Sequence, residues 1–356
     1  MDFYIPLAFY VLIVSIFFSK NKKIMFLMVF VPLLLFWGTR MDFGVDYSSY
    51  KDKFEYQHEW DIMTYLVSVL SGKFEPGYFL LMKIAPDFNS LVFICALIYT
   101  IGLVIFFYEL LPSKYCTLAL FLFLFFPLSY QAVQTMRSSI TLSLFLMACV
   151  AKMKGDMKVA VILASISATF HMSGLLLLLL LLPKNEALAK RHDTLTLFTC
   201  FFVIIALLIP NFWASILKSF VGQVDNFSDA YESYIYERSI GIGFYLLSLM
   251  RFGCVLYVLS LLKRKVLSGN YIWIAWLSIL YYILQLIQNV EITYRFCTYL
   301  YFITIILKCY VLKVDKTKAS KIFVGVSLIY VLFNFYCVTM NPLNAAENQN
   351  YHSFLF

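Results

Sequence analysis

The chain alternates between long runs of apolar residues and short polar breaks. A membrane-spanning helix needs about 20 consecutive, mostly apolar residues. Runs close to that length occupy residues 3–19, 24–38, 89–110, 115–133, 136–152, 157–182, 194–217, 241–263, 271–289, 293–313 and 320–340. The pattern predicts an all-α, polytopic transmembrane protein with about eleven spanning segments and one membrane domain over residues 1–356.

The composition excludes a soluble protein. Hydrophobic residues make up 62% of the chain and charged residues only 13%, whereas about a quarter of the residues of a soluble domain are charged. The net charge of +8 is explained by loops that face anionic lipid, so it does not indicate a nucleic-acid partner.

The charges are sorted between the polar breaks. Lys and Arg gather in four short clusters: Lys20, Lys22 and Lys23; Lys152, Lys154 and Lys158; Lys263, Arg264 and Lys265; Lys313, Lys316, Lys318 and Lys321. Such clusters mark cytoplasmic loops. Acidic residues crowd 39–88 and 218–240 instead, which are therefore predicted to be outer loops.

This orientation requires a break within residues 157–182. If that run crosses the membrane once, every later basic cluster lies on the wrong side. The sequence Phe170-His171-Met172-Ser173-Gly174 interrupts the run near its middle, and non-helical backbone is tolerated at membrane depth where protein or a water-filled cavity covers it. We therefore predict a broken helical hairpin whose apex, His171, points into an outward-facing cavity. Both chain termini are then outside.

The outer segment 39–88 is too apolar and aromatic for a simple linker. Apolar runs at 62–70 and 77–84 predict two short interfacial helices, which can form a lid over a membrane cavity.

Charged or titratable residues in the outer half of the predicted helices are the first candidates for chemistry: Arg137, His171, Arg251, Glu291 and Arg295. A charge near the bilayer centre is costly and usually faces a cavity or a partner. Several guanidinium groups around one cavity suit a diphosphate, which arginine binds through paired hydrogen bonds. The alternatives are a structural ion pair of Arg251 with Glu291 or Glu75, and interfacial snorkelling for Arg137 and Arg295.

His171 has two interpretations. It either holds the helix break open as a hydrogen-bonded core residue, or it donates to phosphate or carries a proton. Among the outer carboxylates, Asp46 and Glu75 are the best candidates, because the neighbouring Gly44 and Pro76-Gly77 allow them to point back toward the cavity mouth.

Five short motifs occur in order along most of the chain. They are Arg40-x-x-x-Gly44-x-Asp46-Tyr47-x-x-Tyr50, Glu75-Pro76-x-Tyr78, Gln134-x-Met136-Arg137, Phe170-His171-x-Ser173 and Arg295-x-x-x-Tyr299. Together they resemble the motifs of the EpsG-like branch of bacterial polysaccharide polymerases, the Wzy class. The chain departs from the family at Ser138, where the family often has glutamine.

The resemblance implies a multi-spanning glycosyltransferase of the GT-C type. It would join undecaprenyl-diphosphate-linked oligosaccharide repeat units at the outer face of the bacterial plasma membrane, with a separate chain-length co-polymerase as partner. By that analogy Arg40, Arg137 and Arg295 contact diphosphate or glycan, with Tyr47 and Tyr299 in the same motifs. Asp46, Glu75 and His171 are the acid, base or acceptor-positioning groups, and Arg251 and Glu291 rest on the topology argument.

No Asp-x-Asp motif or metal-ligand cluster is evident, so neither a divalent ion nor another cofactor is expected. Two other classes would also use cationic groups in a membrane core. They are a flippase for the same lipid-linked oligosaccharides and an acyltransferase that modifies the glycan.

Overall fold

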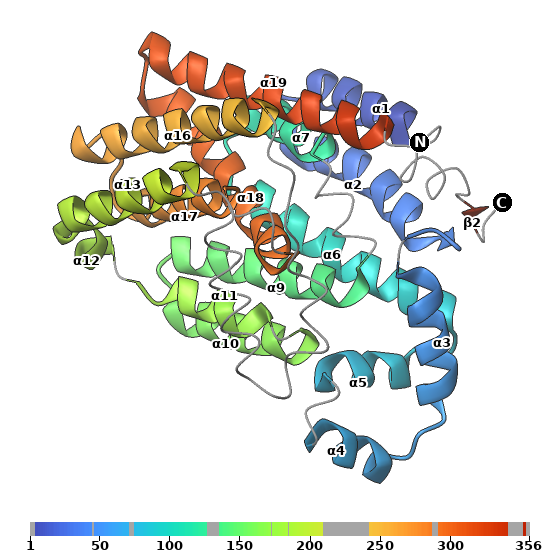
Figure 1. The fold of residues 1–356 in the computed structure, drawn as a ribbon. Helices are drawn as coiled ribbons and strands as arrows, with labels where there is room; N and C mark the ends of the chain where they lie inside the picture. The colour runs from blue at the N-terminus through green and yellow to red at the C-terminus, as the bar shows by residue number, and fades with distance from the viewer. Residues whose placement is uncertain are drawn as a thin grey trace. The chain divides into compact units, whose positions relative to one another are not determined.

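The computed structural model describes residues 4–44, 46–70, 75–126, 135–171, 173–183, 185–208, 242–286, 291–340 and 352–353. The described residues are almost entirely helical (Figure 1). They group into two compact units where the hydropathy pattern suggests a single domain. Unit 1 comprises Met1–Leu182 and Leu328–Phe356, and unit 2 comprises Pro183–Ser327.

Unit 1 contains the helices before residue 182 and one short strand pair. Its helices are α1 (Tyr4–Phe17), α2 (Lys22–Gly38), α3 (Tyr47–His58), α4 (Ile62–Leu70), α5 (Pro76–Ile84), α6 (Phe88–Leu110), the 3₁₀ turn η1 (Ser113–Tyr115), α7 (Cys116–Leu124), α9 (Met136–Met153), α10 (Met157–Phe170) and α11 (Ser173–Leu181). Strand β1 (Arg40–Met41) pairs antiparallel with β2 (His352–Ser353). Unit 2 contains α12 (Asn185–Lys190), α13 (His192–Leu208), α16 (Ile242–Lys263), α17 (Tyr271–Leu284) and α18 (Glu291–Val314). Helix α19 (Lys318–Met340) begins in unit 2 and ends in unit 1.

Among the described residues, five helical stretches are long and apolar enough to cross a membrane. They are Phe88–Leu110, Met136–Met153, Tyr245–Lys263, Phe296–Val314 and Lys318–Tyr336. Shorter apolar helices accompany them, including α1, α10 and α17. These findings confirm the all-α, polytopic membrane fold. Within the predicted run 115–133, α7 ends at Leu124. Residues 127–134 and the predicted outer loop 218–240 lie outside the described part of the chain.

The predicted broken hairpin is present. Helix α10 ends at Phe170, His171 adopts an extended conformation (φ −161°, ψ 137°), and α11 begins at Ser173. Figure 1 shows α11 lying beside α10 and α9. Lys152 Nζ, near the end of α9, donates to Leu181 O at the end of α11. The chain therefore turns at His171 and returns to the end of unit 1 from which α10 started.

Gly174 allows this tight return. A Cβ atom built on Gly174 would lie 2.6 Å from the Cα of Ala168 in α10, so any larger side chain must push the two backbones apart.

We expect Gly174→Ala to destabilise the protein by about 1–3 kcal/mol, the usual range for overpacking. Thermal unfolding of the detergent-purified protein measures the change. Gly253→Ala in α16 is the matched control, because a Cβ there meets no atom within 4 Å. Equal unfolding temperatures for the two variants would contradict this account of the hairpin.

Helix α9 lies against both α6 and the hairpin. Ser143 Oγ donates to Ile98 O of α6 at 2.6 Å, and Thr141 Oγ1 donates to Ser167 O of α10 at 3.1 Å. Small hydroxyl side chains of this kind let membrane helices approach closely and hydrogen-bond across the contact. They set the position of α9, whose first turn carries Arg137.

The basic breaks of unit 1 gather at one end of its helices. Lys22 Nζ donates to Leu111 O at 2.6 Å after the end of α6. Lys154 Nζ lies 2.7 Å from Glu109 Oε2 of the same helix end. Arg137 and Lys152 are separated by 15 residues of α9, or about 22 Å at 1.5 Å per residue. The first turn of α9 therefore lies at the opposite end from the basic breaks.

Unit 2 has the same arrangement. Asn185 Nδ2 donates to Asn270 Oδ1 at 2.5 Å, which joins the start of α12 to the loop after Lys263. Arg264 Nη2 lies 3.2 Å from Asp315 Oδ2, which joins that loop to the one between α18 and α19. The basic clusters 263–265 and 313–321 therefore share one end with the break 183–193, which carries Lys190 and Arg191, as the Lys/Arg pattern predicts.

We expect this end of unit 2 to face the cytoplasm. Single cysteines introduced at Ala189 and Ser268, both exposed, should resist a membrane-impermeant maleimide in intact cells and react after permeabilisation. A cysteine at the exposed Glu59 of the predicted outer loop should react in intact cells, while the unchanged protein gives the background from its own cysteines. Labelling of Ala189→Cys without labelling of Ser268→Cys would refute the shared side.

The described residues of segment 39–88 form three helices, where the sequence predicts two. The predicted runs at 62–70 and 77–84 become α4 and α5. Helix α3 was missed, although its buried residues Tyr47, Tyr50 and Phe54 follow a helical spacing. Tyr47 and Phe54 pack on Phe88 at the start of α6, so α3 is anchored to unit 1.

Candidate functional site

Glu75 is placed by the two residues that follow it. A residue before proline is restricted to extended conformations, and Glu75 has φ −100° and ψ 113°. Pro76 then begins α5, where its missing N–H costs nothing. Gly77 faces the hairpin apex, since a Cβ there would lie 3.0 Å from the ring of Phe170. Together these residues bring α5 against the end of α10 and carry the Glu75 carboxylate to His171.

Arg137 stands in the first turn of α9, directly after Met136. A positive charge at a helix N-terminus is unfavourable, because the helix dipole already makes that end positive. Local helix stability therefore does not explain Arg137, and its guanidinium needs an anionic partner. Glu75 supplies one: Arg137 Nη1 donates to Glu75 Oε2 at 2.8 Å.

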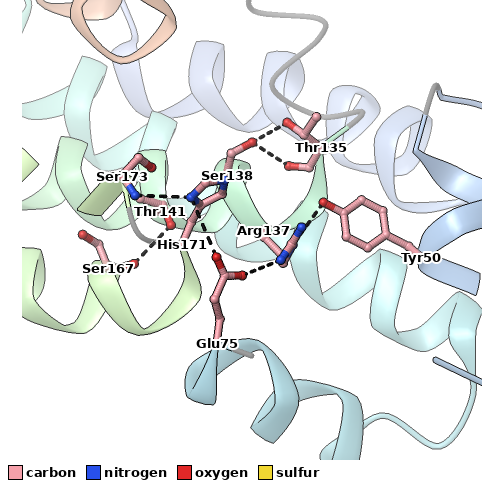
Figure 2. A network of polar contacts seen from close by, with 9 residues as sticks. All are labelled: Tyr50, Glu75, Thr135, Arg137, Ser138, Thr141, Ser167, His171 and Ser173. Carbon is pink, nitrogen blue, oxygen red and sulfur yellow. Dashed lines mark hydrogen bonds and ion pairs between the residues drawn. The ribbon is translucent and has the colours of Figure 1, made fainter. Parts of the chain in front are cut away.

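Figure 2 shows Glu75 between Arg137 and His171, with one carboxylate oxygen directed at each. Glu75 Oε1 lies 3.8 Å from His171 Nδ1. The side chains are 15% exposed for Glu75, 24% for His171 and 33% for Arg137. This partly screened cluster brings together three residues that lie in three different motifs of the chain. Glu75 was considered as a partner of Arg251, and the structure pairs it with Arg137 instead, because α5 lies beside the start of α9 in unit 1.

Tyr50 of α3 is a fourth member of the cluster and was not among the predicted site residues. Its hydroxyl accepts a hydrogen bond from Arg137 Nε at 3.4 Å, and the guanidinium carbon lies 5.6 Å from the centre of its ring. Burial raises the pKa of the Tyr50 phenol, and this effect outweighs the opposite effect of the nearby Arg137 guanidinium. The phenol therefore stays neutral at physiological pH. The helical spacing of Tyr47, Tyr50 and Phe54 was the signal that could have placed it.

His171 Nδ1 has two competing contacts. It lies 3.3 Å from the backbone N–H of Ser173, which can only donate to an unprotonated nitrogen, and 3.8 Å from Glu75 Oε1, which can only accept from a protonated one. The two contacts therefore require different protonation states of Nδ1. Nδ1 accepts from Ser173 when it carries no proton, and a protonated imidazole lies within ion-pair distance of the Glu75 carboxylate. This geometry suits a residue that takes up and releases a proton.

The other predicted site residues of unit 1 lie outside this cluster. Arg40 in β1 is 3% exposed, and its Nη1 donates to Trp37 O at 2.8 Å. Asp46 is the N-cap residue of α3, without a side-chain capping bond. Tyr47 is buried against Phe88. These residues precede or begin α3, the helix that carries Tyr50.

The remaining predicted residues belong to unit 2. Arg251 in α16 is 5% exposed, and its Nη1 donates to Gln285 O, at the end of α17, at 2.8 Å. Tyr299 is buried in α18. Glu291 and Arg295 lie in the first turns of α18, and their side chains are outside the described part of the chain.

Metal ligands are not grouped in the described residues: no set of three or more His, Cys, Asp or Glu residues there could hold an ion.

Comparison with known proteins identifies a family. No curated protein and no solved structure shows significant similarity to this chain. The EpsG family model matches residues 23–353, which is nearly the whole chain and includes every member of the cluster. The chain therefore belongs to the EpsG family, and with it to the polysaccharide polymerases of the membrane in the broad sense.

Proposed function

We propose that this protein joins undecaprenyl-diphosphate-linked oligosaccharide repeat units into a polysaccharide. The growing glycan would leave its lipid diphosphate and attach to the non-reducing end of an incoming lipid-linked unit. The observation that carries this proposal is the cluster of Glu75, Arg137, His171 and Tyr50, which combines a cation for the diphosphate with groups that accept a proton.

Arg137 is suited to the leaving group. Its Nη1 and Nε are engaged by Glu75 and Tyr50, but its Nη2 has no partner among the described residues. Three of its five N–H donors, two of them on Nη2, therefore remain for phosphate oxygens. The two protein contacts hold the guanidinium plane in place, so that little ordering is needed when the diphosphate binds. A cation held at the developing negative charge stabilises the transition state.

The bond changes follow from these positions. The acceptor hydroxyl oxygen attacks the anomeric carbon of the donor glycan, and the bond between that carbon and the lipid diphosphate breaks. The hydroxyl proton passes to Glu75 or, through it, to His171. The electron pair of the broken bond stays on the diphosphate, whose charge Arg137 stabilises. General base catalysis and charge stabilisation are sufficient, because a lipid diphosphate is already a good leaving group.

The orientation of the cluster fits substrates at the outer membrane surface. The cluster lies at the opposite end of α9 from Lys152 and Lys154, and Lys/Arg-rich loops face the cytoplasm. We therefore place the protein in the bacterial plasma membrane, with the cluster toward the exterior or periplasm. A separate co-polymerase would control chain length.

The decisive experiment compares surface glycans in cells that lack the protein and in cells complemented with it. Loss of the protein should leave glycans of a single repeat unit, and complementation should restore a ladder of lengths. Accumulation of lipid-linked units on the cytoplasmic side would indicate a flippase instead. Glycans of normal length without acyl groups would indicate an acyltransferase.

Removal of divalent ions should leave polymerisation intact, because charge stabilisation is assigned to Arg137. The test is chain lengthening by the purified protein, with purified lipid-linked repeat units, in excess EDTA. Activity that disappears and returns only with Mg²⁺ or Mn²⁺ would show that a metal ion performs this role.

A further inference from the structure

A groove between α2 and α6 of unit 1 has no part in the proposed reaction. Its volume is about 530 Å³. It is lined from α2 by Lys23, Phe26, Leu27, Phe30, Val31 and Leu34, and from α6 by Thr100, Val104 and Tyr108. Lys23 is the single charged residue of this lining and stands at one end.

The groove has the dimensions of one membrane leaflet. Lys23 and Leu34 are 11 residues apart in α2, which corresponds to about 16 Å along a helix axis. Half of a hydrocarbon core about 30 Å thick has nearly the same depth. Leu27 and Val31 are 63% and 44% exposed, so the apolar wall is open to an acyl chain.

The charge at the end of the groove is available to a ligand. Lys22 is engaged by the carbonyl oxygens of Tyr108 and Leu111 and lies 4.6 Å from the centre of the Tyr108 ring. Lys23 is exposed and has no carboxylate within ion-pair distance among the described residues. Glu109, the acid at this end of α6, pairs with Lys154.

We infer that the α2–α6 groove binds an anionic phospholipid from the leaflet on the side of Lys20–Lys23. One acyl chain lies along Phe30, Leu34 and Val104, and the headgroup phosphate lies at Lys23. Basic pockets between helices at the cytoplasmic surface bind anionic headgroups in this way, and that leaflet carries the negative lipid. The lipid would hold α2 against α6 at the end opposite the Glu75–Arg137 cluster.

The test uses the full-length protein in detergent, with dioleoylphosphatidylglycerol, dioleoylphosphatidylcholine and undecaprenyl phosphate as probes. Native mass spectrometry counts retained lipid, and the midpoint of thermal unfolding reports stabilisation. Phosphatidylglycerol should bind more tightly than phosphatidylcholine. Lys23→Gln should weaken phosphatidylglycerol binding about fivefold, since one lysine near an anionic lipid surface contributes about 1 kcal/mol.

Lys20→Gln is the matched control. It removes the same charge from the same basic break, but Lys20 does not line the groove, so binding should stay at the unchanged level. Val104→Phe, which fills the groove, should reduce retention of either phospholipid. Equal effects of Lys23→Gln and Lys20→Gln would overturn the inference. So would equal binding of the two phospholipids, or displacement of phosphatidylglycerol by equimolar undecaprenyl phosphate.

Discussion

Chain lengthening is expected to fall by roughly a hundredfold or more when Glu75 is replaced with glutamine, the scale on which a positioned acid or base contributes. The amide keeps the size of the side chain but cannot take a proton from the acceptor. It also leaves the positive charge of Arg137 without its anionic partner at 2.8 Å. Glycan length and in vitro transfer rate measure the loss, with protein level in the membrane measured alongside.

Glu109→Gln is the control for this result. Glu109 also pairs with a basic residue, Lys154 at 2.7 Å, but at the other end of unit 1. It should retain full chain lengthening. If Glu75→Gln makes a normal glycan ladder at normal expression, Glu75 holds the fold together and does not act in transfer. The pH dependence of the transfer rate in His171→Gln distinguishes the two roles of His171. If His171 carries a proton, the variant loses one limb of the pH–rate profile. If His171 is only structural, the shape of the profile stays the same.

Arg137→Lys is expected to slow chain lengthening by roughly tenfold to a hundredfold. Arg137 uses Nη1 for Glu75 and Nε for Tyr50, and lysine has one nitrogen and no planar fork with which to keep both contacts and reach a phosphate. A hydrogen bond to a charged group contributes about 1.5–3 kcal/mol, and about 1.4 kcal/mol changes a rate tenfold. The transfer rate at saturating donor measures the effect.

Arg264→Lys tests whether the effect is specific to the site. Arg264 also pairs with a carboxylate, that of Asp315 at 3.2 Å, in a basic loop of unit 2. This variant should polymerise normally. A full-length glycan ladder from Arg137→Lys at unchanged expression would mean that Arg137 is an interfacial anchor and does not bind the diphosphate.

Tyr50→Phe separates the two contacts of Tyr50 with Arg137. It removes the hydroxyl that accepts from Nε but keeps the ring beneath the guanidinium. Tyr50 does not touch the reacting atoms in our proposal, so we regard it as a positioning residue. A partial loss of rate in this variant would be consistent with that role.

The hydropathy and charge patterns were sufficient to predict the fold class and the hairpin, because both follow from local rules. Apolar run length sets the number of helices, and the Lys/Arg bias required an even number of crossings between 157 and 182. The structure has the predicted break at His171 and the two predicted helices α4 and α5. The division into two units was not foreseen, since hydropathy is similar on both sides of Pro183 and carries no information on which helices pack together.

Local sequence was enough to nominate Glu75, Arg137 and His171 one at a time, as charged or titratable residues at predicted helix ends. Their association depends on the tertiary structure. Glu75 and Arg137 are 62 residues apart, and Tyr50 and Arg137 are 87 apart. Only the packing of α3 and α5 against the start of α9 and the hairpin apex closes these distances. Only the tertiary structure shows that Arg40 lies outside the cluster, where it is buried and bonded to Trp37 O. The sequence pattern identifies charged residues but does not show which groups they contact.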